Sequence, residues 1–277
     1  MSSMTRPFGK RTVIGTAVLL VCSFFWSSTA AARIVENVHD GVIILFIEKP
    51  AADDPGAITS RQFFAKIMES LEILRREAPD IYRRIKALHG RAVIKYDPDY
   101  PKNKFAEVGL AKFATRTGID KYDSLPGKRY VAVLGRFLNK YSAREVAGTI
   151  VHELIGHGRQ HRESRLYDMR ELDRECEVRL LEIDAFQKLK FDKFSKQMIS
   201  FRKLLEKKYC YDYKQYTLKC RPELGKLWKL RDLPVAPLLK IFKSYLMIEP
   251  WAVGSVPSSD PDYDYYAYDF YVTVHRC

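Results

Sequence analysis

The stretch that decides the fold is residues 142–161, which read SAREVAGTIVHELIGHGRQH. It begins with Ser142 and, three residues later, Glu145, a capping box in which hydroxyl and carboxylate bond the exposed backbone N–H groups of a starting helix. Apolar residues then recur at every fourth position, which predicts that one face of the helix is buried. These residues are Val146, Ile150 and Leu154. Three of the six histidines of the chain fall in the same stretch, so the helix combines a core face with a dense imidazole cluster.

Two of these histidines are five residues apart. On an ideal helix of 100° per residue, His152 and His157 diverge by about 140°, so they can share a metal ion only if the helix widens locally into a π-type turn. Gly156, directly before the second histidine, makes such a rearrangement easier. The spacing therefore predicts a widened turn, with Glu153 directly after the first histidine.

A second set of ligands needs no distortion of the helix. Glu153, His157 and His161 follow one another at intervals of four, so all three lie on one face of a regular helix. This set provides no general base and leaves His152 without a role, and we rank it second.

The run HELIGH at 152–157 resembles the His-Glu-x-x-Gly-His zinc motif of the dipeptidyl peptidase III family, which has the same one-residue expansion. In that family a Glu directly followed by Cys on a later helix is the third ligand, and Glu175-Cys176 has that form. The resemblance is confined to residues 141–189. It implies zinc peptidase chemistry, but neither the dipeptidyl activity nor the overall fold of that family.

By analogy with gluzincins, the resemblance implies that His152 and His157 bind Zn²⁺ and that Glu153 is the general base. Two imidazoles and one carboxylate leave a fourth zinc position open for water, whose pKa the metal lowers. Glu153 would take the proton of that water as it attacks the carbonyl of a peptide or protein substrate. The expected function is thus that of a secreted zinc metallopeptidase.

The third ligand is expected on a helix spanning 166–189, which packs back on the first helix as a hairpin. Glu175 is favoured by the Glu-Cys match, and because folding the chain back at Glu163 brings it level with the first histidine. Glu177 is favoured by resemblance, because its twenty-residue separation from the second histidine is similar to that in thermolysin-like enzymes. Helix phase cannot decide between them, since they flank the apolar stripe symmetrically. Two further acids of this helix are candidate partners for the imidazole N–H groups. They are Glu182 and Asp184.

The remaining patterns predict an α+β fold in one domain. This fold is a small mixed sheet packed on a helical hairpin that carries the metal motif, with a further helical basic lobe. Strands are expected at residues 42–47, 92–96, 110–115 and 130–134, and further helices at 59–78, 81–88 and 193–208. We expect residues 130–134 to be a sheet edge along which an extended peptide substrate lies, because main-chain pairing binds extended chains regardless of sequence.

The amino terminus has the pattern of a signal peptide over residues 1–32. Basic residues precede an apolar run at 13–26, and small residues at 28–32 supply a cleavage site. The run is short for a membrane span. We therefore expect export to a periplasmic or extracellular location and a mature domain of residues 33–277.

Four cysteines remain in the mature chain, an even number that permits two disulfides in an oxidising compartment. Cys210 with Cys220 is the first choice, because a hairpin could close the short loop between them. Cys176 is expected either to join a disulfide or to be a buried free thiol.

Composition bounds the remaining possibilities. With 277 residues, of which 47% are hydrophobic, the chain can build a packed core, and this excludes disorder as its dominant state. Residues 188–231 contain 14 basic and 4 acidic side chains, so this basic lobe could contact an anionic envelope surface. A nucleic acid is not an expected partner of an exported chain that has no recognition motif. The alternative to a peptidase is a non-catalytic periplasmic envelope protein with a structural or degenerate metal site, in which the basic lobe binds anions.

Overall fold

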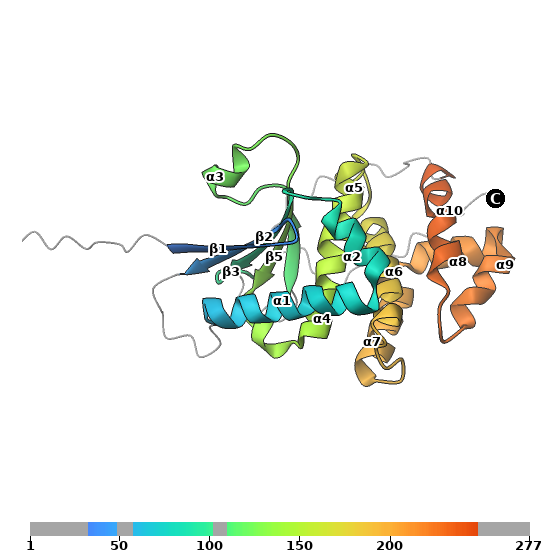
Figure 1. The fold of residues 1–277 in the computed structure, drawn as a ribbon. Coiled ribbons are helices and arrows are strands. Elements are labelled where there is room, and N and C mark those ends of the chain that lie inside the picture. The colour runs from blue at the N-terminus through green and yellow to red at the C-terminus, as the bar shows by residue number, and fades with distance from the viewer. Residues whose placement is uncertain (1–32, 49–57, 102–109, 249–277) are drawn as a thin grey trace, which may run out of the picture. The chain divides into compact units, whose positions relative to one another are not determined.

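The computed structural model describes residues 33–48, 58–101 and 110–248, and it has the α+β architecture that the sequence predicts (Figure 1). The predicted signal peptide, residues 1–32, lies outside the described residues. Within the described ranges, none of the helices combines the length and the apolar character needed to cross a lipid bilayer.

A mixed sheet in the order β1-β2-β3-β5-β4 forms one layer of the described fold. Its strands are β1 (Arg33–His39), β2 (Val42–Glu48), β3 (Ala92–Asp97), β4 (Ala111–Ala114) and β5 (Tyr130–Gly135). β2, β3 and β5 run parallel, whereas β1 and β4 are antiparallel to their neighbours. The prediction that residues 130–134 form a sheet edge is wrong, because β4 pairs with the outer side of β5. The edge at that side of the sheet is β4.

β1 is the one strand of this sheet that the sequence patterns do not predict. Most of its side chains are exposed, so it lacks the buried apolar run that identifies the other strands. It joins β2 through Asp40 and Gly41, whose φ angles of 48° and 81° form the left-handed two-residue turn that suits the twist of a hairpin.

The helical elements follow the predicted order. They are α1 (Ser60–Glu77), α2 (Pro79–Lys86), α3 (Asp120–Asp123), η1 (Arg136–Lys140), α4 (Ala143–Ile150), η2 (Val151–His157), α5 (Gly158–Arg162), α6 (Glu171–Lys188), α7 (Lys196–Leu204), η3 (Leu205–Tyr209), α8 (Tyr211–Cys220), α9 (Pro222–Gly225), η4 (Lys226–Lys229) and α10 (Val235–Ile248). The capping box at Ser142 and Glu145 is formed at the start of α4, as predicted.

The strands separate two clusters of apolar side chains. Ile44 and Phe46 of β2 belong to the main core, which also contains the buried residues of α1, α2 and α4. Ile43 and Leu45 belong to a smaller cluster, because successive side chains of a strand point to opposite faces of the sheet. The sheet and α1 thus hold α4 and the helical turns that follow it in place.

α6 contributes to two cores at once. Ala185 and Leu189, at its carboxyl end, pack in the main core. Cys176, Leu180 and Ile183 pack in a second core that is otherwise built from Met169 and residues 205–245. The helix that carries the predicted third ligand is therefore fixed from both sides.

A disulfide joins α6 to the residue before α8. It links Cys176 and Cys210, whose Cα atoms are 4.8 Å apart. The predicted Cys210–Cys220 pair is therefore wrong, and of the two alternatives for Cys176 the disulfide is the one that forms. The physical reason is that residues 211–220 form the helix α8 rather than a hairpin. Ten helical residues span about 15 Å, too far for a disulfide.

Candidate metal centre

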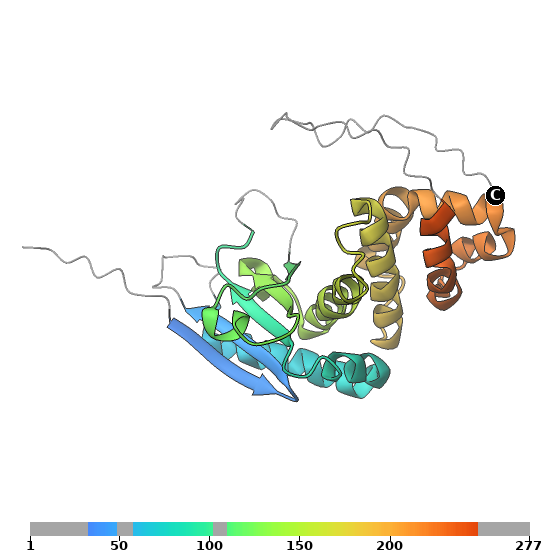
Figure 2. The same cartoon turned by 90° about the horizontal axis from the view of Figure 1, so that it is seen from above.

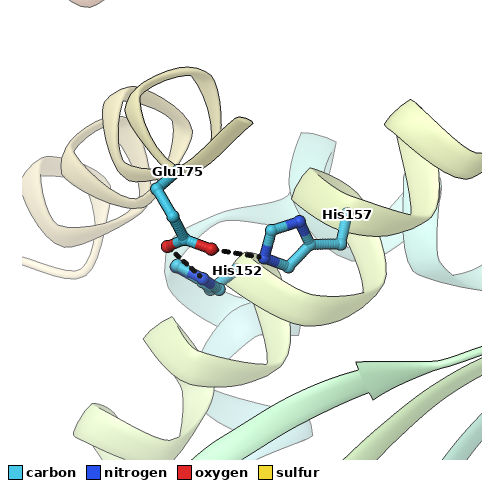
Figure 3. A group of neighbouring side chains, drawn as sticks. All are labelled: His152, His157 and Glu175. Carbon is cyan, nitrogen blue, oxygen red and sulfur yellow. Dashed lines mark ion pairs between the residues drawn. The ribbon is translucent and has the colours of Figure 1, made fainter. Parts of the chain in front are cut away.

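The two histidines of the motif and one glutamate of α6 converge on a common point (Figure 3). His152, His157 and Glu175 each offer one ligand atom, and the three atoms all lie within 4.8 Å of one another. Oε1 of Glu175 is 3.2 Å from Nε2 of His157, and its Oε2 is 3.7 Å from Nε2 of His152. This group could bind a metal ion.

The helix is widened where the motif requires it. Residues Val151–His157 form the π-helical element η2, between the α-helical turns of α4 and α5. A π-type turn brings residues five apart onto the same face. The rings of His152 and His157 accordingly lie with their centroids 5.0 Å apart and their planes at 76°. The predicted widening between the two histidines is confirmed.

α6 supplies the carboxylate because it runs back beside η2 and packs against it (Figure 2). The helical segment that carries the histidines ends with α5 at Arg162. Ser164, between α5 and α6, has a left-handed φ of 59°, a backbone conformation common just after a helix end. This is where the sequence predicts the chain to turn. The hairpin places Glu175 opposite the two imidazoles.

The carboxylate of Glu175 is held in its charged form. Burial opposes its ionisation, but the hydrogen bond with His157 and the positive charges of His152, His157 and Arg179 outweigh burial and lower its pKa to about 2. The surrounding carboxylates act in the opposite direction on His152. Burial opposes its protonation, but the negative charge of Glu182, a hydrogen bond to it, and the charges of Glu153 and Glu175 raise its pKa to about 9.

Glu177, the other candidate for the third ligand, lies outside the group. Its carboxylate accepts two hydrogen bonds from the guanidinium of Arg165, both at 3.0 Å, and a third from Nε2 of Gln160 at 3.0 Å. Glu177 is almost fully buried, so its charge is matched by this bidentate pair. Of the two alternatives that the sequence left open, the structure brings only Glu175 to the histidines.

Each imidazole is bonded at the nitrogen that faces away from Glu175. Nδ1 of His152 lies 3.0 Å from Oε2 of Glu182, as the sequence suggested. Nδ1 of His157 lies 3.0 Å from Oε1 of Gln160, which the sequence analysis missed. Asp184, the other predicted partner, pairs with Lys188 instead. Both rings are thus fixed with Nε2 directed at Glu175, the arrangement in which a metal ion could bind between them.

A buried chain of side chains extends behind His157. Gln160 accepts from the imidazole and uses its amide N–H₂ to donate to Glu177, which is in turn held by Arg165. Gln160 is fully buried. A residue three positions after a histidine lies on the same helix face, and this spacing is the one sequence signal that could have identified it.

Glu153, the predicted general base, is buried beside the group. Its Oε2 has no hydrogen-bond partner among the described residues. Burial raises its pKa, against the lowering effect of His152 and His157. A buried carboxylate oxygen without a partner is costly, so it indicates a place where a proton donor from outside the chain can bind. Burial, followed by the negative charge of Glu153, also raises the pKa of nearby Tyr100.

Arg179 was not predicted, although its spacing from Glu175 places it one turn further along α6. Its Nε lies 3.5 Å from Oε2 of Glu175, and one terminal nitrogen lies 3.8 Å from Oε2 of Glu182. The guanidinium is supported by the ring of Tyr209, 4.1 Å away. One cation therefore faces both acids that contact His152.

His161 is not drawn into the metal group. Its ring packs against Phe113 and Tyr130, at centroid distances of 5.9 Å in each case. Within the described ranges, the set Glu153, His157 and His161 is not brought within reach of one metal ion. The widened helix accounts for this, because it changes the faces on which residues four apart lie.

The edge strand β4 borders the centre. Phe113 of β4 packs against His157 with their rings 6.2 Å apart. Tyr100, which lies outside the strand, donates a hydrogen bond from its hydroxyl to the backbone carbonyl of Ala111 in β4. Within the described ranges, β4 is thus an edge strand next to the imidazole cluster, and one of its carbonyls already accepts from Tyr100.

Comparisons with known proteins assign no family to this geometry. No family model, curated protein or solved structure matches the chain. The likeness to the dipeptidyl peptidase III motif is therefore a likeness of short motifs. The geometry shows a His/His/Glu group that could hold a metal ion. Which ion it binds must be argued from the chemistry of these ligands.

Proposed function

We propose that the protein is an exported zinc-dependent peptidase that cleaves peptide bonds with Glu153 as its general base. One observation carries the proposal: a buried carboxylate with an unpartnered oxygen lies next to a three-residue His/His/Glu group. A metal site with a purely structural role needs no such carboxylate. A hydrolytic site does, because a proton must leave the attacking water.

The donor set fits zinc. Two imidazole nitrogens and one carboxylate oxygen are a common set at catalytic zinc sites, which keep a fourth position for water or substrate. Glu182 and Gln160 bond the outer nitrogens of the imidazoles, which is the usual way a protein orients histidine ligands of zinc. When bound, zinc supplies a Lewis acid and lowers the pKa of a water molecule toward neutrality.

Glu153 performs the proton transfers in this proposal. Its Oε2 accepts the proton of the attacking water and then delivers it to the departing amine nitrogen. The raised pKa of the carboxyl suits this exchange, because a base whose pKa lies nearer the working pH can both take and return a proton.

The substrate in this proposal is an extended peptide or protein segment. β4 (Ala111–Ala114) is an edge strand of the sheet next to His157, and an extended chain can add to such an edge through main-chain hydrogen bonds. This replaces the inner strand β5 as the expected platform. Recognition through the main chain accepts many side chains, so we expect broad sequence tolerance along β4.

Export is supported by the Cys176–Cys210 disulfide, since structural disulfides persist in oxidising compartments and are rare in the cytosol. Together with the signal-peptide pattern of residues 1–32, it favours a periplasmic or extracellular enzyme.

The test combines metal analysis with a cleavage assay. The purified protein is analysed for bound metals by mass spectrometry and incubated with an unfolded protein and a quenched fluorescent peptide library. Chelator is then added, and zinc is restored. Glu153→Gln is the matched variant, since it keeps the shape of the side chain and removes the base.

We expect one zinc ion per chain and chelator-sensitive cleavage that Glu153→Gln loses while keeping its zinc. A protein that purifies without metal and gains no thermal stability from zinc would contradict the proposal. Stoichiometric zinc without cleavage of any peptide would favour the non-catalytic envelope protein with a structural site.

A further inference from the structure

The basic lobe carries an unusual share of exposed apolar side chains. Phe194, Ile199 and Leu230 are 57%, 50% and 49% exposed, and Leu204 is also exposed. The helix α7 (Lys196–Leu204) has no fully buried residue. Phe201 of α7 packs in part against the second core, but the exposed Ile199 and Leu204 leave apolar surface of this helix available for a partner.

These apolar side chains and a group of cations line the same cavity. Its volume is about 980 Å³, and it lies between the carboxyl end of α6, α7 and the segment after η4. Phe194, Ile199 and Leu230 all line it. The basic residues that line it are Lys190, Lys193, Arg202, Lys229 and Arg231. Three acidic residues, Asp192, Glu206 and Asp232, also line it. The cavity thus has aromatic and aliphatic walls and a rim on which basic side chains outnumber acidic ones.

Three of the rim cations lack acidic partners. Lys193 pairs with Asp232, and Arg202 pairs with Glu206. Within the described ranges, no carboxylate lies in ion-pair distance of Lys190, Lys229 or Arg231, and all three are exposed. Arg231 instead lies over the ring of Phe194, with its guanidinium carbon 3.8 Å from the ring centroid.

We propose that this face, defined by Lys190, Phe194, Ile199, Lys229, Leu230 and Arg231, docks the protein on an anionic phospholipid surface. The cations would bind lipid phosphates, and the apolar side chains would enter the boundary between headgroups and acyl chains. The argument is charge complementarity combined with exposed apolar area. An acidic protein would need an apolar patch that matches Phe194 and Leu230 in position, whereas an anionic bilayer supplies charge and apolar depth over its whole surface. The proposal is independent of the peptidase site.

The test is co-sedimentation of the purified protein with vesicles. One set contains phosphatidylcholine alone, and the other contains equal parts of phosphatidylcholine and phosphatidylglycerol. We expect binding to the anionic vesicles only, weakened by added salt because the cations are exposed. The variant Lys190→Gln/Lys229→Gln/Arg231→Gln should bind roughly a hundredfold more weakly, since each cation near an anionic surface contributes about fivefold.

A second variant tests the apolar contribution. Phe194→Ser with Leu230→Ser should weaken binding without changing its salt dependence. The matched control is Leu125→Ser, since Leu125 is also an exposed leucine, at 45%, but lies outside the basic lobe. Glu153→Gln should bind vesicles like the parent protein, which separates this result from the fate of the peptidase proposal. No sedimentation with anionic vesicles, or equal weakening by Leu125→Ser, would overturn the docking proposal.

Discussion

A Cβ atom built on Gly156 would lie 2.3 Å from Cγ1 of Val178, closer than two non-bonded carbon atoms can approach. Gly156 lies in the π-helical element η2, and Val178 lies in α6. The glycine thus serves a further purpose beyond making the widened turn easier. It lets α6 approach η2 closely enough for Glu175 to meet the two imidazoles.

We therefore expect Gly156→Ala to destabilise the protein by about 1–3 kcal/mol through overpacking, although alanine normally favours a helix over glycine. Zinc affinity should fall as well, because α6 must move outward. Denaturant unfolding of Gly156→Ala, Val178→Ala and the double variant measures this. Val178→Ala should relieve the clash, so the two effects should be strongly non-additive. Additive effects would mean that the close contact does not set the hairpin spacing.

Glu153→Gln separates chemistry from metal binding. Zinc content should persist, and cleavage should fall by roughly a hundredfold or more, the usual contribution of a general base. Metal analysis and steady-state kinetics on the same preparation provide the two measurements. Loss of zinc together with activity would identify Glu153 as a ligand.

The two glutamates of α6 provide a matched pair two residues apart. Glu175→Ala should lose most of the zinc affinity, whereas Glu177→Ala should lower it roughly 10–100-fold, because it removes the carboxylate that helps to hold the amide of Gln160, and Gln160 positions the imidazole of His157. Zinc titration against a competing chelator distinguishes these losses. Equal, small effects in both variants would remove the gluzincin interpretation.

The pH dependence of stability should reflect the ion pair between α1 and α4. The hydrogen bonds that Arg144 and Arg76 donate to Glu77 outweigh burial and lower the pKa of that carboxyl to about 2. A lowered pKa stabilises the fold above the ordinary value of 4.5, and this stability is lost as the pH falls from about 4.5 to about 2. Glu77→Gln should lower the free energy of unfolding by about 2 kcal/mol at neutral pH. It should also weaken the pH dependence of the melting temperature over that acidic range. An unchanged acid profile would contradict this assignment.

Replacing both Cys176 and Cys210 by serine should destabilise the protein by about 4 kcal/mol, the value for opening a loop of 34 residues. Zinc affinity should fall too, because Glu175 is the residue directly before Cys176. Thermal melting with and without zinc gives both quantities. If the variant bound zinc as tightly as the parent, the disulfide would have no part in positioning the ligand.

The sequence predicted those elements whose signal is local. Buried apolar runs located β2, β3 and β5, and the capping box at Ser142 located the start of α4. The five-residue interval between His152 and His157 predicted a π-type turn, because helix geometry alone decides where the rings point. β1 escaped prediction because its residues, RIVENVH, are mostly exposed and its pairing with β2 is a tertiary fact.

Features that depend on how helices meet could not be read from the chain. Glu175 and Glu177 have equivalent positions relative to the apolar stripe, and the choice between them depends on Arg165, which neutralises Glu177 from the loop between the helices. The disulfide prediction is wrong because sequence proximity favours a Cys210–Cys220 pair. The intervening residues form the helix α8, which keeps the two cysteines apart. Gln160 turns its amide carbonyl to His157 because two acceptors from α6, the carboxylate of Glu177 and the backbone carbonyl of Arg174, hold its amide N–H₂.

The double packing of α6 has a consequence for the modularity of the chain. A fragment ending at Leu189 would retain every member of the metal group, yet the face of α6 that carries Leu180 and Ile183 would be open to water. The helix α6 packs both against the core beside the sheet and against the carboxyl-terminal helices. Recombination that moves the metal group into another protein would therefore have to carry both cores, because a boundary between them exposes the apolar face of α6 in one part and removes its contacts from the other.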